Sequence, residues 1–365
     1  STPLPSPPSP LMETEPILGH VPKTKIEARS YFRRSFILYE RSESIAQQLC
    51  LVERDVLLAV QWEELVHCRW TKMNINMDGR QDGKNEDAHF TDKPQKSSRF
   101  DSSLHHGVQD AIQRFNMVCQ WVASEIVRAP NLEVRVRTIE KFIRIAEKCR
   151  MYSNFATLIQ VLLGLQAPAV SRLHKTWSKV RNSELKILDE LSSFTSPTKN
   201  WKHMRDSMTT VAEEYGMSST DIQIEMPGTS TIRGFPLSSR GRVKIPFGGC
   251  IPFLGIYLSD LVFNSEQPAY IESPWEKTDT NRIYRLLTRS NNQKDISPLL
   301  KQPLVNFSKH RVTAMIIKRV LTFQNLARRY PFELNPDLYS RCNEFECLTP
   351  DVVKALSHVT ERHKD

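Results

Sequence analysis

Apolar residues recur every three to four positions in one long segment after another of this 365-residue chain. The first series consists of Ile45, Leu49, Val52, Val56 and Val60. This spacing matches the turn of an amphipathic helix, and the pattern along the chain predicts about ten helices. Glycine is scarce, with 12 residues, which disfavours tight β-hairpins and glycine-rich phosphate loops. The sequence therefore predicts an all-α fold without a sheet.

Several of the predicted helices have recognisable ends or an unusual composition. Ser42 or Ser44 is expected to cap the first helix. Residues 155–165 are almost all apolar, which is typical of a fully buried helix. Another helix is expected over 200–211. Thr349 stands directly before a proline and an aspartate, so it is predicted to cap the last helix.

Long polar stretches interrupt the helical pattern. Residues 1–30 are rich in proline and serine and are expected to form a flexible lead-in. Residues 31–365 are expected to form a single large helical domain. Its long polar insertions are predicted at about 73–100, 217–249 and 267–303, because loops of this length inside a compact domain are usually functional or disordered.

The chain carries a formal net charge of +9. Such an excess favours nucleic acid, an anionic membrane surface or an acidic protein surface as a partner. Acidic and basic residues are interleaved, however, and no dense basic run alternates with aromatic residues. A helical nucleic-acid binder is therefore the weaker alternative, and nucleic acid is not expected. No stretch approaches the roughly 18 apolar residues of a membrane span, so a soluble intracellular domain is expected.

Seven cysteines are scattered along the predicted helices. An odd, dispersed set favours reduced thiols in the core of an intracellular protein. Cys342 and Cys347 precede His358 and His363 in the order of a zinc finger. The gap between the two pairs is shorter than the usual spacing and contains no hairpin pattern. Neither a metal ion nor another cofactor is expected.

Motifs of covalent catalysis are absent from the sequence. It contains no HExxH, GxSxG, P-loop or paired CxxC motif. The most distinctive segment is IPFLGIYLSDLVF, residues 251–263, with Glu266 shortly after it. Periodicity alone predicts a buried helix after a proline-marked turn. The chain is therefore expected to act by binding a protein partner and not by making or breaking covalent bonds.

Seven segments in order resemble the catalytic domain of Ras-family guanine nucleotide exchange factors, the family that includes Son of sevenless. These are IAQQLCLVERD (45–55), RFNMVCQWVASEI (114–126), RTIEKFIRIAEKCRMYSNFATLIQVLLGL (137–165), VSRLHKTW (170–177), IPFLGIYLSDLVF (251–263), VNFSKHR (305–311) and LTPDVVKALSHVTER (348–362). The amino-acid sequences of these segments and the insertions between them are most similar to those of the fungal branch of the family. The resemblance also assigns His358 to an ordinary closing helix.

The resemblance implies a partner and a way of acting on it. The partner is a Ras-family small GTPase, preferred in its nucleotide-free state, and the action is non-covalent promotion of GDP release. In the family, a protruding helical hairpin opens switch I. In this chain the hairpin would begin near Ser259, with Glu266 reaching the Mg²⁺ site and Val262 beside it. The domain is expected in the cytoplasm, near a membrane or the cell cortex through its GTPase.

The resemblance further implies a pocket that receives an aromatic side chain of switch II. Its expected walls are Ile112, Ile159, Trp201 and Phe253. Gln166 stands where the family usually has an asparagine that touches the GTPase, and Gln113 stands where Son of sevenless has an arginine. The hairpin region is also longer than usual. A module that binds the GTPase without exchanging its nucleotide therefore stays open as an alternative.

Overall fold

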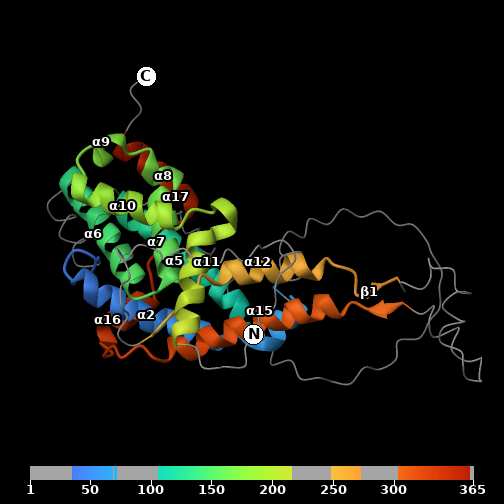
Figure 1. The fold of residues 1–365 in the computed structure, drawn as a ribbon. Helices are drawn as coiled ribbons and strands as arrows, with labels where there is room; N and C mark the ends of the chain where they lie inside the picture. Colours follow the sequence, from blue (N-terminus) through green and yellow to red (C-terminus); the bar gives the residue numbers. More distant parts are fainter. Residues whose placement is uncertain (1–34, 69, 72–105, 216–247, 273–302, 362–365) are drawn as a thin grey trace, which may run out of the picture.

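The computed structural model describes residues 35–68, 70–71, 106–215, 248–272 and 303–361. These residues form an all-α body from which a pair of helices projects (Figure 1), which confirms the predicted fold class. Apart from residues 248–249, 267–272 and 303, the predicted insertions lie outside the described ranges, as does the predicted lead-in at 1–30. Within the described ranges, every helix is too short or too polar to cross a bilayer.

The first part of the body contains α2 (Ser42–Ala59), α3 (Trp62–His67), α5 (Gly107–Arg128), α6 (Leu132–Met151) and α7 (Phe155–Gln166). It continues with α8 (Pro168–Ser171), α9 (His174–Trp177), α10 (Asn182–Phe194), α11 (Thr198–Tyr215), α16 (Pro336–Asn343) and α17 (Pro350–Thr360). The projecting hairpin consists of α12 (Leu254–Ser265), β1 (Tyr270–Ile271), β2 (Leu304–Val305) and α15 (Phe307–Ala327).

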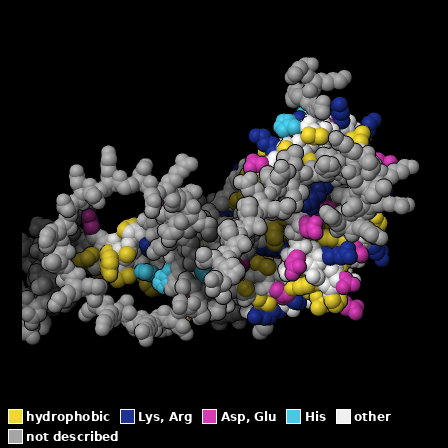
Figure 2. All heavy atoms as spheres, turned by 180° about the vertical axis from the view of Figure 1, so that it is seen from behind, with side chains coloured by type: hydrophobic (Ala, Val, Ile, Leu, Met, Phe, Trp, Pro, Cys, Tyr) yellow, Lys and Arg dark blue, Asp and Glu magenta, His cyan; other side chains and the backbone are white. Residues whose placement is uncertain are grey.

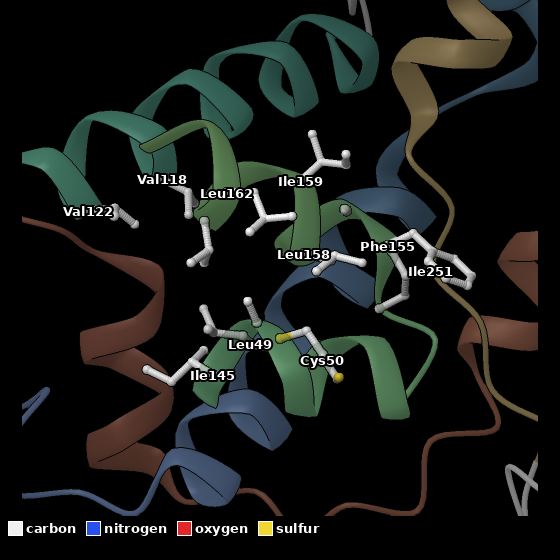
Figure 3. Packing of buried hydrophobic residues seen from close by; sticks show 14 of the residues in the cluster. Leu49, Cys50, Val118, Val122, Ile145, Phe155, Leu158, Ile159, Leu162 and Ile251 are labelled. Atoms are coloured by element: carbon white, nitrogen blue, oxygen red, sulfur yellow. The ribbon is translucent and has the colours of Figure 1, made fainter. Parts of the chain in front are cut away.

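Helix α7 lies at the centre of the body. It packs against α2, α5 and α6, and its apolar side chains meet those of α2 and α5 (Figure 3). The predicted burial of residues 155–165 is confirmed apart from Leu163, which is 43% exposed. Gly164 permits a close approach to α5, because a Cβ there would lie 2.6 Å from Cβ of Val122. Each buried large aliphatic side chain contributes roughly 1.5–3 kcal/mol, so α7 holds its neighbours together.

Two predictions about helix ends differ in outcome. Thr349 caps α17 as predicted, since its side chain accepts a hydrogen bond from the amide of Val352. The predicted serine cap of α2 is wrong. The N-cap residue is Arg41, which makes no side-chain capping bond, and Ser42 is the first helical residue. The buried face of α2 stabilises this helix without a cap, in keeping with the dominance of packing over local preference.

Helix α11 contains a left-handed turn near its start. Lys199, Asn200 and Trp201 have φ values of 54°, 56° and 60°. This conformation costs an L-residue roughly 1–2 kcal/mol, and asparagine tolerates it better than most. The helix predicted over 200–211 is therefore wrong at its first two residues.

A buried ion pair joins four helices. Nε of Arg114 on α5 lies 3.1 Å from Oε1 of Glu53 on α2, and both side chains are 5% exposed. Gln160 of α7 donates to the other carboxylate oxygen of Glu53 at 3.3 Å. The two terminal nitrogens of Arg114 donate to the carbonyls of Cys342 and Asn343 at the end of α16. The Arg114 guanidinium thus donates hydrogen bonds to groups from distant parts of the chain.

A second polar cluster fastens the end of α17 to α9. The carboxylate of Glu361 accepts hydrogen bonds from the amides of Lys175 and Thr176 at 2.9 Å and from the Thr176 hydroxyl at 2.6 Å. Arg172 donates to the carbonyls of Ser357 and Glu361. Burial alone would raise the pKa of Glu361, but the hydrogen bonds from Thr176 and Lys175 outweigh it and lower the pKa below its ordinary value.

Polar side chains hold the outer end of the hairpin together. Asn264 of α12 donates to the Lys309 carbonyl at 2.9 Å and to the Thr313 hydroxyl at 2.8 Å. The Lys309 ammonium in turn donates to the carbonyls of Ser265 and Gln267. Asn306 caps α15 and donates to the Pro268 carbonyl. These bonds cross-link α12 and α15 side by side.

Beyond α12, β1 and β2 pair antiparallel. Tyr270 lies opposite Val305, and Ile271 lies opposite Leu304. All four side chains are exposed, and apolar side chains are visible at this end of the hairpin in Figure 2. Residues 267–272, which were predicted to open an insertion, thus extend the hairpin.

Replacing Arg114 by methionine is expected to lower the free energy of unfolding by about 3–5 kcal/mol, because Glu53 is left buried and unpaired. Urea denaturation measures the change. Arg54→Met is the matched control, since Arg54 pairs with its exposed neighbour Asp55 and its loss should cost about 1 kcal/mol or less. Equal losses in the two variants would contradict the role given to the buried pair.

Replacing Glu361 by glutamine is expected to destabilise the chain by about 1.5–3 kcal/mol at neutral pH, because hydrogen bonds to a charged acceptor are lost. The carboxylate has a lowered pKa in the folded state, so its contribution is fully present above the unfolded pKa and is lost as the pH falls through the folded pKa. The difference between wild type and variant should therefore shrink in acid. Urea denaturation as a function of pH would show a constant difference if this reasoning were wrong.

Candidate functional site

An apolar pocket of about 240 Å³ lies where α12 joins the body. Its lining comes from α2, α5, α7 and the start of α12. The lining residues are Glu53, Val56, Leu57, Ala111, Ile112, Phe115, Ala156, Gln160, Ile251, Pro252, Phe253, Leu254, Gly255 and Leu258. Most of these side chains are apolar, so the pocket suits a hydrophobic or aromatic group.

Phe253 forms a wall of this pocket and is the N-cap residue of α12. Its ring stacks on that of Phe115 with a centroid distance of 5.3 Å. Trp201 meets the same ring edge-on at 5.4 Å. Aromatic rings favour both arrangements. Phe253 is therefore held from two sides, by α5 and by the left-handed turn of α11.

Gly255 makes room for the ring of Phe253. A Cβ at this position would lie 2.8 Å from two ring carbons of Phe253, which is closer than real Cβ contacts allow. Glycine in a helix costs about 1 kcal/mol relative to alanine. At Gly255 this cost is offset because the absence of a Cβ lets the Phe253 ring lie close to the first turn of α12.

Two residues of the pocket lining are polar. Glu53 and Gln160 line it, and both are buried. Glu53 is neutralised by Arg114, and the amide nitrogen of Gln160 points to Glu53. Within the described ranges, Oε1 of Gln160 accepts no hydrogen bond from the protein. The buried ion pair that joins four helices therefore contributes Glu53 to the pocket lining.

Three residues of α12 form an exposed stripe beyond the pocket. Ser259, Phe263 and Glu266 are spaced four and three residues apart, which places them on one face of the helix. All three are exposed, Phe263 at 73%. Val262 lies beside the stripe and is half-buried. An apolar ring and a carboxylate thus stand next to each other on a helix that projects from the body (Figure 1).

Glu266 is the C-cap residue of α12. A carboxylate is unfavourable there, because the carbonyls at a helix C-terminus carry partial negative charge. The nearby Lys309 ammonium donates to the carbonyls of Ser265 and Gln267, not to the Glu266 side chain. The position of Glu266 is therefore not explained by the stability of its own helix.

Gln166 lies in a different hollow. This second pocket, of about 280 Å³, is lined by Leu165, Gln166, Ser171, His174, Trp177, Leu188 and Ser192. It shares no lining residue with the first pocket. The exposed side chain of Gln166 ends α7, so it is attached to the most buried helix of the body.

Comparison with known proteins assigns this arrangement. Residues 44–311 match the RasGEF domain family, which is more than half of the chain and includes both the pocket and α12. The chain belongs to the RasGEF domain family. The match confirms the family predicted from the seven ordered segments.

Among its relatives are fungal proteins named guanine nucleotide exchange factor LTE1. The chain is 24% identical to the Kluyveromyces lactis protein over 327 residues, covering 88% of this chain and 18% of that protein. It is 24% identical to the Saccharomyces cerevisiae protein over 322 residues, covering 88% and 17%. Ras guanine nucleotide exchange factor E of Dictyostelium discoideum is 31% identical over 221 residues, covering 60% and 15%. The predicted likeness to the fungal branch is confirmed, and the chain spans less than a fifth of these relatives.

The structure of this RasGEF domain brings some of the predicted site residues together and separates others. Ile112 and Phe253 line the first pocket, and Trp201 supports Phe253 from outside it. Ile159 is 2% exposed and packs in the core. Gln113 is exposed on α5 beside Ile112. Of the four predicted walls, two therefore line the pocket directly.

Phe115, Leu258 and Gly255 were not among the predicted pocket residues. Phe115 follows Ile112 by three positions on α5, so helical periodicity could have identified it. Leu258 and Gly255 belong to the IPFLGIYLSDLVF segment. The polar part of the lining could not be found from sequence, because Glu53 and Gln160 are distant along the chain and neither residue type indicates its partner.

The order of cysteines and histidines that resembles a zinc finger does not form a cluster in the described residues. The Cys342 side chain is buried, and this burial raises the pKa of its thiol to about 12. His358 is exposed on α17, and His363 lies outside the described ranges. No group of three or more possible metal ligands occurs in the described part of the chain.

Replacing Gly255 by alanine is expected not to stabilise this RasGEF domain, although alanine favours a helix. The new Cβ would push the Phe253 ring out of place. In a Phe253→Ala background the obstacle is gone, so Gly255→Ala should then stabilise the fold by about 1 kcal/mol. Urea denaturation measures the effect of Gly255→Ala on the free energy of unfolding in each background. The difference between the two effects is the coupling free energy of positions 253 and 255. The same effect of Gly255→Ala in the two backgrounds would show that the ring does not constrain position 255.

Proposed function

We propose that this chain binds a Ras-family small GTPase and accelerates release of its GDP by opening switch I with the α12–α15 hairpin. One observation carries the proposal. An exposed stripe that includes Ser259 and Glu266 lies on a projecting helix, and the first residues of that helix form the wall of an apolar pocket. The pocket anchors the GTPase and the stripe displaces the elements around its nucleotide. The chain is thus a non-covalent catalyst that needs no cofactor.

The energy required is within the reach of a protein interface. A Ras-like GTPase binds its nucleotide with roughly picomolar affinity, or about 16 kcal/mol, and the phosphates and Mg²⁺ supply much of it. Accelerating release by about 10⁵ requires about 7 kcal/mol of differential binding. An aromatic side chain of switch II buried in the first pocket contributes roughly 2–3 kcal/mol of anchorage. The rest comes from the wider surface.

Glu266 and Val262 act at the metal and phosphate site of the GTPase. The Glu266 carboxylate repels phosphate and engages a hydroxyl or lysine of the phosphate loop, while the alkyl group of Val262 offers Mg²⁺ no ligand. The exposure of Glu266 and its unfavourable place at a helix C-terminus support this role. Because nucleotide and exchange factor weaken each other's binding, the nucleotide-free GTPase is the preferred partner.

Gln113 and Gln166 contribute contacts at the edges of the same GTPase surface. Both are exposed and are attached to α5 and α7, which form the rigid core of the body. The domain would act in the cytoplasm and approach a membrane or the cell cortex through its GTPase. Nucleic acid has no part in this proposal.

Replacing Glu266 by alanine is expected to slow GDP release by about 10²-fold, the scale of losing an electrostatic group at a reacting site. Release of a fluorescent GDP is measured on a panel of Ras-family GTPases at micromolar domain. Glu213→Ala is the matched control, since Glu213 is an exposed acid on α11, away from the stripe. The control should retain the wild-type rate, and both variants should retain the wild-type melting temperature.

Two outcomes would count against exchange. The first is that no GTPase of the panel releases GDP faster with the wild-type domain. The second is a complex that survives excess GTP, because an exchange complex dissolves when nucleotide returns. A stable complex of this kind would identify the chain as a module that binds a GTPase without emptying it.

A further inference from the structure

Arg205 of α11 links the body to the base of α12. Its two terminal nitrogens donate to the two carboxylate oxygens of Asp260, at 2.7 Å and 2.9 Å. The Arg205 and Asp260 side chains are 26% and 30% exposed, so the pair is partly shielded from water. A two-pronged contact of this kind fixes direction as well as distance, which a lysine cannot do.

The same guanidinium is oriented by the left-handed turn. Nε of Arg205 donates to the Asn200 carbonyl at 2.9 Å, and one terminal nitrogen donates to the Asn200 side chain at 3.2 Å. Asn200 can present both acceptors to Arg205 because its φ is 56°. Trp201, next in the turn, meets the pocket wall Phe253 edge-on. One short turn therefore contacts the pocket and also aims the arginine at the hairpin.

A second contact lies closer to the start of α12. The Tyr257 hydroxyl points to the sulfur of Met208 at 3.9 Å. Tyr257 precedes Asp260 by three residues, and Met208 follows Arg205 by three, so the two contacts join facing turns of α11 and α12, which cross each other in Figure 1. Further along α12, Asn264 bonds α15 and not the body. The Arg205–Asp260 pair therefore adds a polar contact to the part of α12 whose Leu258 and Leu261 side chains are buried in the core.

We propose that Arg205 is a positioning residue, which fixes the angle of the α12–α15 hairpin relative to the pocket through Asp260. The inference rests on the proposed exchange function for its kinetic consequence, but its structural consequence is independent of it. With the pair intact, the pocket and the Ser259–Glu266 stripe form one surface. Without it, the GTPase still docks in the pocket, while Glu266 meets the nucleotide site less often.

The test compares Arg205→Met, Arg205→Lys, Asp260→Asn and the double variant Arg205→Met/Asp260→Asn in the full 365-residue chain. Lys202→Met is the matched control, because Lys202 is an exposed cation on the same helix. Hydrogen–deuterium exchange reports on the amides of α12. Single-turnover release of fluorescent GDP, titrated with domain, separates the maximal rate from the half-saturating concentration.

In Arg205→Met, hydrogen–deuterium exchange of the α12 amides beyond Asp260 should become faster, and the maximal rate of GDP release should fall. Each change should be about fivefold, which is the size expected from the loss of a partly exposed ion pair. The half-saturating concentration should stay within about twofold, because pocket docking is unchanged. Asp260→Asn should reproduce the effect, and the double variant should be no worse than either single variant. Arg205→Lys should resemble Arg205→Met.

If the α12 amides of Arg205→Met show the same hydrogen–deuterium exchange rate as the wild type, the inference is overturned, whatever the rate of GDP release. Additive losses in the double variant, or wild-type behaviour of Arg205→Lys, would also overturn it. A merely structural role would instead lower the melting temperature and leave the maximal rate per folded molecule unchanged. If no GTPase responds to the wild-type chain, the proposed function fails, and amide exchange still decides whether Arg205 holds the hairpin.

Discussion

The buried pair of Arg114 and Glu53 connects the architecture of this RasGEF domain to its site. Two charges away from water are tolerated only when their remaining hydrogen-bonding groups are satisfied. Gln160 and the two carbonyls at the end of α16 supply that satisfaction. The pair and its partners come from four helices, so it requires α2, α5, α7 and α16 to assemble together. Since Glu53 also lines the pocket, the pocket exists only when this assembly is complete.

The hairpin depends on the same core through a short connection. The amide of Phe155, at the start of α7, donates to the Ile251 carbonyl, and the amide of Ile251 donates to the Ser153 carbonyl. Ile251 stands three residues before α12 begins. The start of the most buried helix is thus bonded to the segment from which the hairpin emerges. A hairpin attached in this way takes its position from the core.

Much of the helical fold could be predicted from sequence, because it follows from apolar periodicity, and periodicity is local. The buried α7 and the Thr349 cap are of this kind. The failures are of another kind. The cap of α2 was misassigned because packing stabilises that helix without one. Asn200 was assigned to a regular helix, although it lies in a left-handed turn whose carbonyl accepts a hydrogen bond from Arg205, five residues further along α11. Ile159 was expected at a pocket wall, but the distinction between core and wall depends on neighbours from other helices.

A projecting helix can transmit force to a partner only if it is stiff, and an isolated helix in water is not reliably so. In this chain the outer end of α12 is bonded to α15 through Asn264, Lys309 and Asn306. The exposed stripe of Ser259, Phe263 and Glu266 lies on α12, and α15 packs against that helix. Polar residues on a surface add little net stability, but here they hold the two helices of the hairpin in a fixed position relative to each other. They fix the spacing of the two helices at the outer end of the hairpin, beyond the apolar contacts that α12 and α15 make with the core through Leu261 and Val320.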